Sequence, residues 1–427
     1  MTRVVITGLG AITPIGNDVD TFWKNMKDGV SGAERITAFD ASDYNIQFAC
    51  EVKDFDPTIW IDKRTAKRFA RSTQFAIATS RQALEDAQFE ITEENSKRVG
   101  IVINSGGGGL SVMEEATEKL LNSGPRSISP FLITSIMMNA VSSMVSIELG
   151  TMGPLNSSAL ACASGNHALL DAYHFIKRGE ADVVISGGSE ATISPVIFAS
   201  FARMGALSAN NMDPKGASRP FDKGRDGFVF GEGAVAMVLE SEEHARARGA
   251  RIYGEILGGS LTSDGHHVTA PKPDASGSAE ALKRALDYCG KKPEEVDAIF
   301  AHATSTPLGD TAETLALKKV LGERAFQIPV TATKSQVGHM LGAAGAVSAL
   351  AAVKSIQEGI ICPTINYETP DPECDLDYVP NEARPHQIDL ALVNAFGFGG
   401  HNCVITLGRY QENGNGSNGN GKTNGIG

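Results

Sequence analysis

The chain has 427 residues and carries 38 lysines and arginines against 50 aspartates and glutamates, a formal charge of −12 at pH 7. Such an acidic chain does not favour nucleic acid as its main ligand, because neutralising phosphates requires a basic face. At roughly 150 residues per domain, the length fits two or three domains, or one large α/β architecture with an internal duplication.

Short β-branched runs alternate with helical patterns along the chain, an order that is typical of α/β folds. The predicted strands cover residues 3–7, 99–104, 182–186, 235–240, 252–258, 296–301, 328–331, 390–394 and 403–407. The predicted helices cover residues 67–87, 130–149, 164–178, 278–289, 311–321 and 342–358. In the second helix, Ser129 is the expected N-cap and Pro130 the first helical residue, where no amide donor is lost.

The order of these elements is weakly repeated. VGIVINSGG (99–107) is similar to VDAIFAHAT (296–304), and ADVVISGGSE (181–190) is similar to LALVNAFGFGG (390–400). The repeat predicts two similar halves, residues 1–250 and 251–410, whose loops together form an active site. The last segment, 411–427, is rich in Asn, Gly and Ser and is expected to be a disordered tail.

Three classes of binding or location are not favoured by the sequence. The six cysteines form no Cys-x-x-Cys pair, so neither a disulfide framework nor a zinc ribbon is expected. The glycine-rich segments 7–16 and 106–109 lack the spacing of a dinucleotide fingerprint and the Lys-Ser/Thr end of a phosphate loop, respectively. No apolar run approaches the roughly 18 residues of a membrane helix, and the first residues lack signal-peptide features. We therefore expect a cytoplasmic protein without a membrane association.

Cys162 lies where an extended stretch turns into an apolar helix, in ALACASGNHALL. Backbone N–H groups and the helix dipole favour a thiolate at such a point, whereas a small buried core cysteine is the plain alternative. His302 follows a predicted strand, and His339 precedes a helix rich in Ala and Gly. Each histidine alone fits a structural role, but a cysteine with two histidines in strand-end loops predicts a catalytic centre.

Four segments in this order carry a resemblance: ACASGNHA around Cys162, HATSTPLGD around His302, TKSQVGHMLGAAG around His339 and NAFGFGGHN at 394–402. They resemble the four motifs of the β-ketoacyl-[acyl carrier protein] synthases of the thiolase superfamily, and the elongating type II branch is the most similar. The resemblance covers roughly residues 1–410. It implies a thiolase-like fold, with two similar α/β halves stacked as layers of helices and mixed sheets. The first half would carry the nucleophilic cysteine and the second both histidines.

The activity implied by the resemblance is a decarboxylative Claisen condensation in two half-reactions. An acyl group passes from a carrier thioester to Cys162, and malonyl carrier protein then loses CO₂ and attacks that thioester. The backbone N–H groups of Cys162 and Phe398 would form the first oxyanion hole. His302 and His339, as neutral Nε2–H donors, would stabilise the enolate in the second half-reaction.

Further residues have supporting roles that the resemblance implies. Lys334 would orient the site, with Glu313 as its ion-pair partner and Asp310 on the same helical turn; solvated surface charges are the alternative. Phe398 would act as a gate. The residues expected to contact substrate are Thr304 and Thr306 on the phosphopantetheine arm, Phe201 and Gly107 at the acyl pocket, and Asp264 in the loop facing the gate.

Three positions depart from the family's usual pattern. Ala303 replaces a glycine beside His302, which is expected to crowd the substrate arm or to shift His302. Gly107 stands where a large apolar residue is common, so a steric stop for long acyl chains is expected to be absent. Ser348 replaces an acid of a monovalent-cation site, and we therefore expect no required metal. No cofactor is expected beyond the phosphopantetheine that the acyl carrier protein itself brings.

The expected partners are an acyl carrier protein and a second copy of the chain. An acidic carrier requires a basic docking surface, and the basic residues that gather on this chain are Lys63, Arg64, Lys67, Arg68 and Arg71, with Arg126. A solvated helix face is the alternative for each of them. The homodimer is implied by the resemblance alone.

Two other functions stay open at this point. A thiolase pairs its nucleophilic cysteine with a second cysteine that acts as acid and base, and Cys403 is a poor candidate for that role. A chain-length factor shares the fold but lacks the nucleophile, whereas this chain has Cys162.

Overall fold

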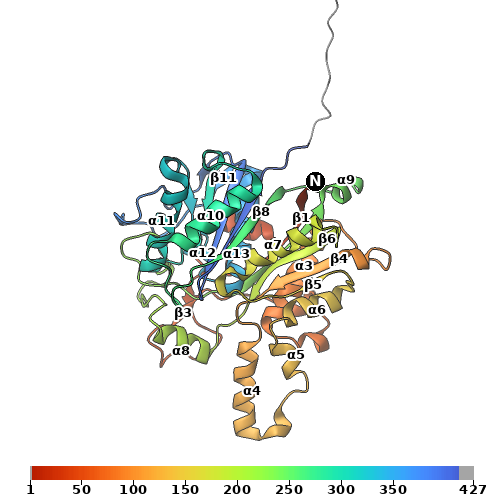
Figure 1. Cartoon of the computed structure of the whole chain (residues 1–427). Coiled ribbons are helices and arrows are strands. Elements are labelled where there is room, and N and C mark those ends of the chain that lie inside the picture. Colours follow the sequence, from red (N-terminus) through yellow and green to blue (C-terminus); the bar gives the residue numbers. More distant parts are fainter. Residues whose placement is uncertain (1, 413–427) are drawn as a thin grey trace, which may run out of the picture.

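The computed structural model describes residues 2–412, which fold around a ten-stranded mixed sheet (Figure 1). The strand order in the sheet is β10-β9-β13-β14-β8-β1-β7-β6-β4-β5. The strands are β1 (Val4–Ile12), β4 (Val99–Asn104), β5 (Leu155–Asn156), β6 (Val183–Glu190), β7 (Gly233–Ser241), β8 (Gly254–Ser263), β9 (Ala298–Phe300), β10 (Val330–Thr331), β13 (Leu390–Gly397) and β14 (His401–Gly408). Two small sheets, β2 (Glu34–Arg35) with β3 (Phe48–Ala49) and β11 (Ile360–Ile361) with β12 (Arg384–Pro385), lie outside it.

The sheet has two sections that follow the order of the chain. Strands β1 and β4 to β7 lie on one side, strands β8 to β10, β13 and β14 lie on the other, and β1 pairs with β8 over only three residue pairs. Helices α7 (Ser164–Lys177) and α13 (Ala344–Glu358) contact strands of both sections and each other, and they carry much of the central core. Helices α3 (Arg71–Asp86) and α6 (Ala140–Leu149) cover the first section, and α10 (Ser276–Cys289) covers the second, with α11 (Pro307–Leu321) packed beside it. This is the layered α/β arrangement that was predicted.

The remaining helices are α1 (Val19–Lys27), α2 (Lys63–Ala66), α4 (Leu110–Ser123), α5 (Leu132–Ile136), α8 (Pro195–Arg203), α9 (Glu242–Ala247) and α12 (Lys334–Val337). Two predicted helices are interrupted. The helix predicted over 67–87 starts only at Arg71, because Ala70 is extended with ψ 152°. The helix predicted over 130–149 divides at Met137, whose ψ of 142° is extended, and its first part begins at Leu132 rather than Pro130.

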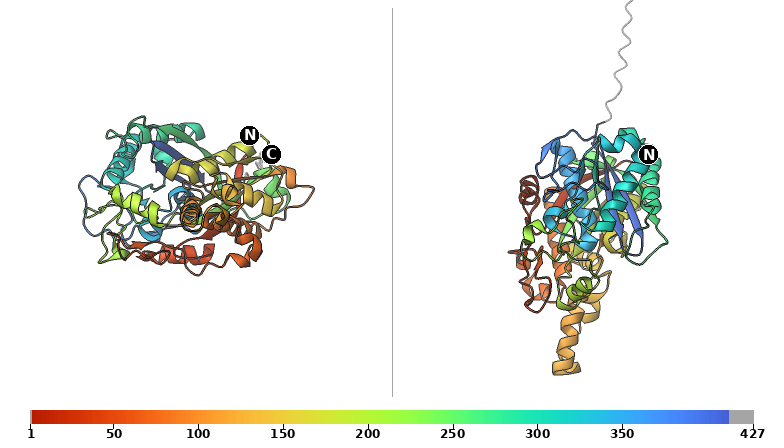
Figure 2. Two further views of the ribbon diagram at one scale, coloured as in Figure 1. Left: turned by 90° about the horizontal axis from the view of Figure 1, so that it is seen from below. Right: turned by 90° about the vertical axis from the view of Figure 1, so that its left-hand side faces the viewer.

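Helices α4 and α5, with the turn η3 (Pro125–Ser127) between them, project from the body as an arm (Figures 1 and 2). Large apolar side chains on the arm are exposed, including Leu121 and Ile133. Ile147 on α6 and Leu155 on β5 are exposed as well, and β5 is the edge strand of the sheet. An apolar surface of this extent on a projecting element is typical of an interface with another protein.

Two observations concern the described residues as a whole. Within 2–412, no helix combines the length and the apolar character needed to span a membrane. In the same range, no three His, Cys, Asp or Glu side chains are grouped so that they could hold a metal ion. Most of the tail predicted to be disordered, from residue 413 on, lies outside the described residues.

Candidate active site

Cys162 is presented by a strained turn at the start of α7. It lies in the short helix η4 (Ala161–Ala163), and Ala161 has a φ of +47°. The backbone of Gly397 passes so close that an added Cβ would lie 2.6 Å from the Leu160 carbonyl oxygen and 3.2 Å from the Cys162 nitrogen. The glycine therefore lets the loop that follows β13 lie against the nucleophile.

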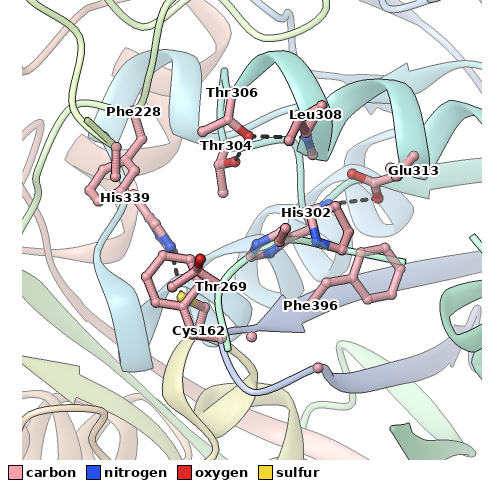
Figure 3. A pocket seen from close by; sticks show the side chains of 18 of the residues that line it. Cys162, Phe228, Thr269, His302, Thr304, Thr306, Leu308, Glu313, His339 and Phe396 are labelled. Carbon is pink, nitrogen blue, oxygen red and sulfur yellow. Dashed lines mark hydrogen bonds between the residues drawn. The ribbon is translucent and has the colours of Figure 1, made fainter. Parts of the chain in front are cut away.

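Both predicted histidines lie beside Cys162, on loops of the second section of the sheet. The Nε2 atom of His339 lies 3.0 Å from Cys162 Sγ, and the centres of the His302 and His339 rings are 5.6 Å apart (Figure 3). All three side chains are buried, yet they line one cavity of about 390 Å³. Three residues separated by up to 177 positions in the chain thus share one chamber.

Burial controls the protonation of these groups. Desolvation and the charge of Lys334 hold the pKa of both histidines well below the usual value, so both rings are neutral at pH 7. Desolvation raises the pKa of the Cys162 thiol to about 11, although Lys334 and the backbone N–H groups of Phe398 and Cys162 oppose this shift. Burial thus opposes the thiolate that the helix start favours, and the backbone N–H groups and Lys334 counter only part of that cost.

Lys334 and Glu313 hold the His302 segment from two directions. The Lys334 ammonium donates a hydrogen bond to the carbonyl oxygen of His302. The Glu313 carboxylate accepts hydrogen bonds from the N–H groups of His302 at 2.8 Å and Ala303 at 2.7 Å, and from the Asn394 amide at 2.9 Å. The salt bridges among the described residues do not include the predicted Lys334–Glu313 pair. Lys334 instead donates to the His302 carbonyl, and Glu313 accepts from the backbone N–H groups and the Asn394 amide. The two charges still interact at longer range.

Asp310 fixes the loop that follows His302. Its carboxylate accepts hydrogen bonds from the N–H groups of Phe221 at 2.8 Å and Ser305 at 3.1 Å. Within this loop, Ala303 has a φ of +31°, in the left-handed region that favours glycine. Ala303 is thus strained itself, and it is 1 % exposed, so its methyl group points away from the cavity rather than crowding it.

The cavity is lined by the expected gate Phe398 and by four of the five residues that were expected to contact substrate: Phe201, Asp264, Thr304 and Thr306. The hydroxyl groups of Thr304 and Thr306 are 3.0 Å apart at the start of α11. Figure 3 shows the two side chains next to each other. Phe201 and Phe398 stack with ring centres 6.3 Å apart. After Phe398 the chain has two glycines with positive φ, so this loop has the backbone freedom that a gate needs.

Gly107 does not line this cavity, and the absence of a steric stop for long acyl chains stays a prediction. A Cβ added at Gly107 would lie 2.6 Å from Thr192 Cγ2, so the space beside the glycine is occupied. The N–H group of Gly107 donates instead to the buried Glu190 carboxylate. Thr192, at 1 % exposure, therefore occupies the space beside Gly107.

The expected docking residues occupy two separate places. Arg64 lies in α2, Lys67 and Arg68 lie in the turn before α3, and all three are exposed. Arg126 is also exposed but lies in η3 at the tip of the arm (Figure 1). Within one chain, three of the four expected docking residues thus lie close together, and Arg126 lies apart from them. Arg71 differs from them because its guanidinium is bound to the buried Glu232 carboxylate.

Some residues in the cavity lining, and Glu190 behind it, had no role in the sequence interpretation. Phe228 contacts the His339 ring edge-on with ring centres 5.1 Å apart, and Phe396 lies 5.7 Å from the His302 ring. Glu190 accepts hydrogen bonds from Gly106, Gly107 and Gly342, and so joins two site loops. The alternation of Phe228 and Phe230 in the sequence indicated a strand-like segment, but nothing in it identified the histidine as a neighbour.

Comparison with known proteins gives consistent matches over nearly the whole chain. Family models described as "Beta-ketoacyl synthase, N-terminal domain" and "Beta-ketoacyl synthase, C-terminal domain" match residues 1–245 and 253–368. A 3-oxoacyl-[acyl-carrier-protein] synthase 2 from Synechocystis sp. (strain ATCC 27184 / PCC 6803 / Kazusa) is 49 % identical, with 96 % of this chain and 98 % of the relative covered. A protein of the same name from Staphylococcus aureus (strain COL) is 46 % identical, with 96 % and 99 % covered.

Solved structures agree with these matches. The ishigamide ketosynthase/chain length factor superposes with a TM-score of 0.90 at 37 % identity, covering 96 % of this chain and all of the other. A type II PKS acyl-carrier protein in complex with its ketosynthase gives a TM-score of 0.89 at 33 % identity, with the same coverage. The predicted thiolase-like α/β fold is confirmed by this likeness.

Proposed function

The chain belongs to the β-ketoacyl synthase family, and on that premise we propose that it condenses acyl-[acyl carrier protein] with malonyl-[acyl carrier protein] in fatty acid elongation. The products are 3-oxoacyl carrier protein, CO₂ and free carrier protein. The observation that carries this proposal is the placement of one buried thiol and two neutral imidazoles in one cavity.

In the first half-reaction, Cys162 takes the acyl group from the carrier. Sγ attacks the thioester carbonyl, the bond to the carrier sulfur breaks, and the thiol proton leaves with the departing carrier thiol. The N–H groups of Cys162 and Phe398 both face Sγ and are therefore close to where the thioester oxygen gains charge. His339 Nε2, 3.0 Å from Sγ, orients the thiol.

In the second half-reaction, the malonyl group loses CO₂ and its electron pair forms an enolate. His302 and His339 donate Nε2–H hydrogen bonds to the enolate oxygen, and neutral rings suit this task because each keeps one N–H donor. The enolate carbon attacks the acyl-Cys162 carbonyl, the carbon–sulfur bond breaks, and the thiolate regains a proton from solvent. Lys334 acts as a positioning residue that holds His302 and contributes positive potential.

The remaining expectations about partners and location join the proposal. The exposed residues Arg64, Lys67 and Arg68 present positive charge that suits an acidic carrier, and a ketosynthase of known structure is in complex with its carrier. We propose that a homodimer forms through the arm, α6 and β5, whose apolar side chains are exposed. Six free cysteines in the described residues support a reducing cytoplasm. The separate matches before residue 245 and after residue 253 support the division into halves near residue 250.

The decisive experiment offers the purified protein a series of acyl carrier substrates together with malonyl carrier protein. We expect a covalent acyl adduct on Cys162 and 3-oxoacyl carrier protein extended by two carbons, neither of which Cys162→Ala forms. Condensation by Cys162→Ala at the wild-type rate would overturn the proposal in favour of a non-catalytic subunit. Carbon–carbon bond formation from acetyl-CoA without CO₂ release would favour a thiolase, although Cys162 is the one cysteine among the cavity residues that the structure describes.

A further inference from the structure

Arg71 is placed against the usual preference for a helix start. It is the first residue of α3, where the helix dipole disfavours a positive charge, and Ala70 before it provides no side-chain cap. Its guanidinium packs 4.6 Å from the centre of the buried Phe75 ring. A local role at the start of the helix does not explain this placement of Arg71. A partner elsewhere in the chain explains it.

That partner is Glu232, 161 positions along the chain. Arg71 Nε donates to one carboxylate oxygen at 3.0 Å and Nη2 to the other at 2.8 Å, a two-pronged geometry that fixes orientation as well as distance. The same Nη2 donates to the Val52 carbonyl, and the Val52 N–H donates to Glu232. The Glu232 side chain is only 6 % exposed. The Arg71 side chain is 41 % exposed, so the pair differs from an ordinary surface salt bridge in the burial of its carboxylate and in the number of its bonds.

Glu232 ends a short backbone ladder that leads to the catalytic cavity. The Glu232 N–H donates to the Cys50 carbonyl, and the Cys50 N–H donates to the Phe230 carbonyl at 2.7 Å. On the opposite edge of the same segment, the Gly231 N–H donates to the His339 carbonyl at 3.0 Å, and the His339 N–H donates to the Val229 carbonyl at 2.7 Å. Segment 228–232 thus lies between the Cys50 strand and the backbone of His339.

The contact between this segment and the His339 loop leaves little room to move. A Cβ on Gly231 would lie 2.6 Å from the Val337 carbonyl oxygen, and the Phe228 ring lies edge-on to the His339 ring. A change in the position of segment 228–232 must therefore change the position of His339. A misplacement of about 1 Å at a reacting group can cost about 10²-fold in rate.

We propose that Arg71 and Glu232 form a positioning pair that sets the place of His339 in the cavity, and that Arg71 is not a carrier-docking residue. The inference rests on the proposed function of His339 in decarboxylation. Because Arg71 lies only three residues after the exposed Arg68, the pair also joins the proposed docking surface to the catalytic histidine through continuous structure. Acylation depends less on the pair, since its oxyanion donors are the backbone N–H groups of Cys162 and Phe398, and His339 only orients the thiol in that half-reaction.

The test uses substrates that bypass the carrier protein, namely the malonyl and acyl thioesters of N-acetylcysteamine. In the full-length protein, Arg71→Ala and Glu232→Gln are each expected to lower malonyl decarboxylation about tenfold, a fraction of the loss for a 1 Å displacement. The rate of Cys162 acylation, measured by mass spectrometry, is expected to fall less than threefold. The decarboxylation rate of Arg71→Lys is expected to lie between those of wild type and Arg71→Ala. The double variant should be no slower than the slower single variant, because both changes break one unit.

The matched control is Arg98→Ala, which removes another two-pronged pair, with Asp182 at 2.8 and 2.9 Å. This pair lies at the starts of β4 and β6, whereas Gly106 and Glu190 lie at the other ends of these strands. Its rates should stay near those of wild type. Unchanged decarboxylation in Arg71→Ala would overturn the inference. So would a loss of decarboxylation that appears only with carrier-borne substrate. An equal loss of acylation and decarboxylation, together with a lowered melting temperature, would also overturn it. If wild type itself neither acylates nor decarboxylates, the proposed function fails instead.

Discussion

Replacing His302 by alanine removes one of the two Nε2–H donors to the enolate and leaves the surroundings of Cys162 intact. The described hydrogen bonds join Sγ to the His339 ring, not to the His302 ring, and the backbone groups that hold Lys334 and Glu313 are unchanged in the variant. Losing one preorganised donor to a developing oxyanion costs about 10²–10³ in rate, or about 2.7–4 kcal/mol. His302 is 8 % exposed, so water cannot readily replace the lost donor, and the larger value is expected.

The assay follows both half-reactions separately. In His302→Ala, CO₂ release from malonyl carrier protein is expected to fall by this factor, while acylation of Cys162 changes by less than about threefold. His386→Ala is the control, because that ring binds the Asp297 carbonyl at 2.9 Å and lies outside the cavity lining. Unimpaired CO₂ release in His302→Ala, or an equal loss of acylation, would refute the separation of roles argued from the geometry.

Three further predictions follow from the same structure. Burial lowers the pKa of Lys334 to about 8, so the decarboxylation rate should decline as the pH rises through 8 and Lys334 loses its charge. Lys334→Met should lack this alkaline decline. A decline that persists in the variant would show that another group causes it. Thr192→Ala should empty the space beside Gly107 and shift product length upward in a mass-resolved elongation assay, whereas an unchanged product distribution would show that this space does not limit the acyl chain. Ile147→Lys should convert the proposed dimer to a monomer, as measured by light scattering. Ile59→Lys, at a similarly exposed position on the turn η1 (Pro57–Ile59), should leave the dimer intact. A dimer that persists in Ile147→Lys would show that the interface lies elsewhere.

Local patterns were sufficient for most strands and failed for several helices. The β-branched runs predicted both ends of β4 correctly, because a strand that is buried on both faces is an almost uninterrupted run of apolar residues. They ended β1 too early, since Gly8 and Gly10 interrupt the apolar pattern. These glycines are required by α3: an added Cβ on either would lie 2.1 Å from a backbone carbonyl oxygen of that helix. Helix α1 was missed although Asp18 caps it, by accepting a hydrogen bond from the Thr21 N–H at 2.7 Å.

The site residues could be proposed from motifs, whereas their contacts could not. The resemblance implied an ion pair between Lys334 and Glu313, but the chain folds so that the lysine reaches the His302 carbonyl instead. Gly107 was interpreted alone, although its meaning depends on Thr192, which comes from another strand end. Arg71 resembled its basic neighbours until its distant partner Glu232 was known. In each case the deciding contact is nonlocal, and a single sequence does not encode it in any short pattern.

The most direct measurement of the central claim is the ratio of CO₂ released to 3-oxoacyl carrier protein formed by the purified protein. With unlabelled acyl carrier protein and malonyl carrier protein labelled in its free carboxyl group, we expect the wild type to release one CO₂ for each new carbon–carbon bond, and Cys162→Ala to form no 3-oxoacyl carrier protein. Products that form without CO₂, or that form equally well without the Cys162 thiol, would contradict this mechanism.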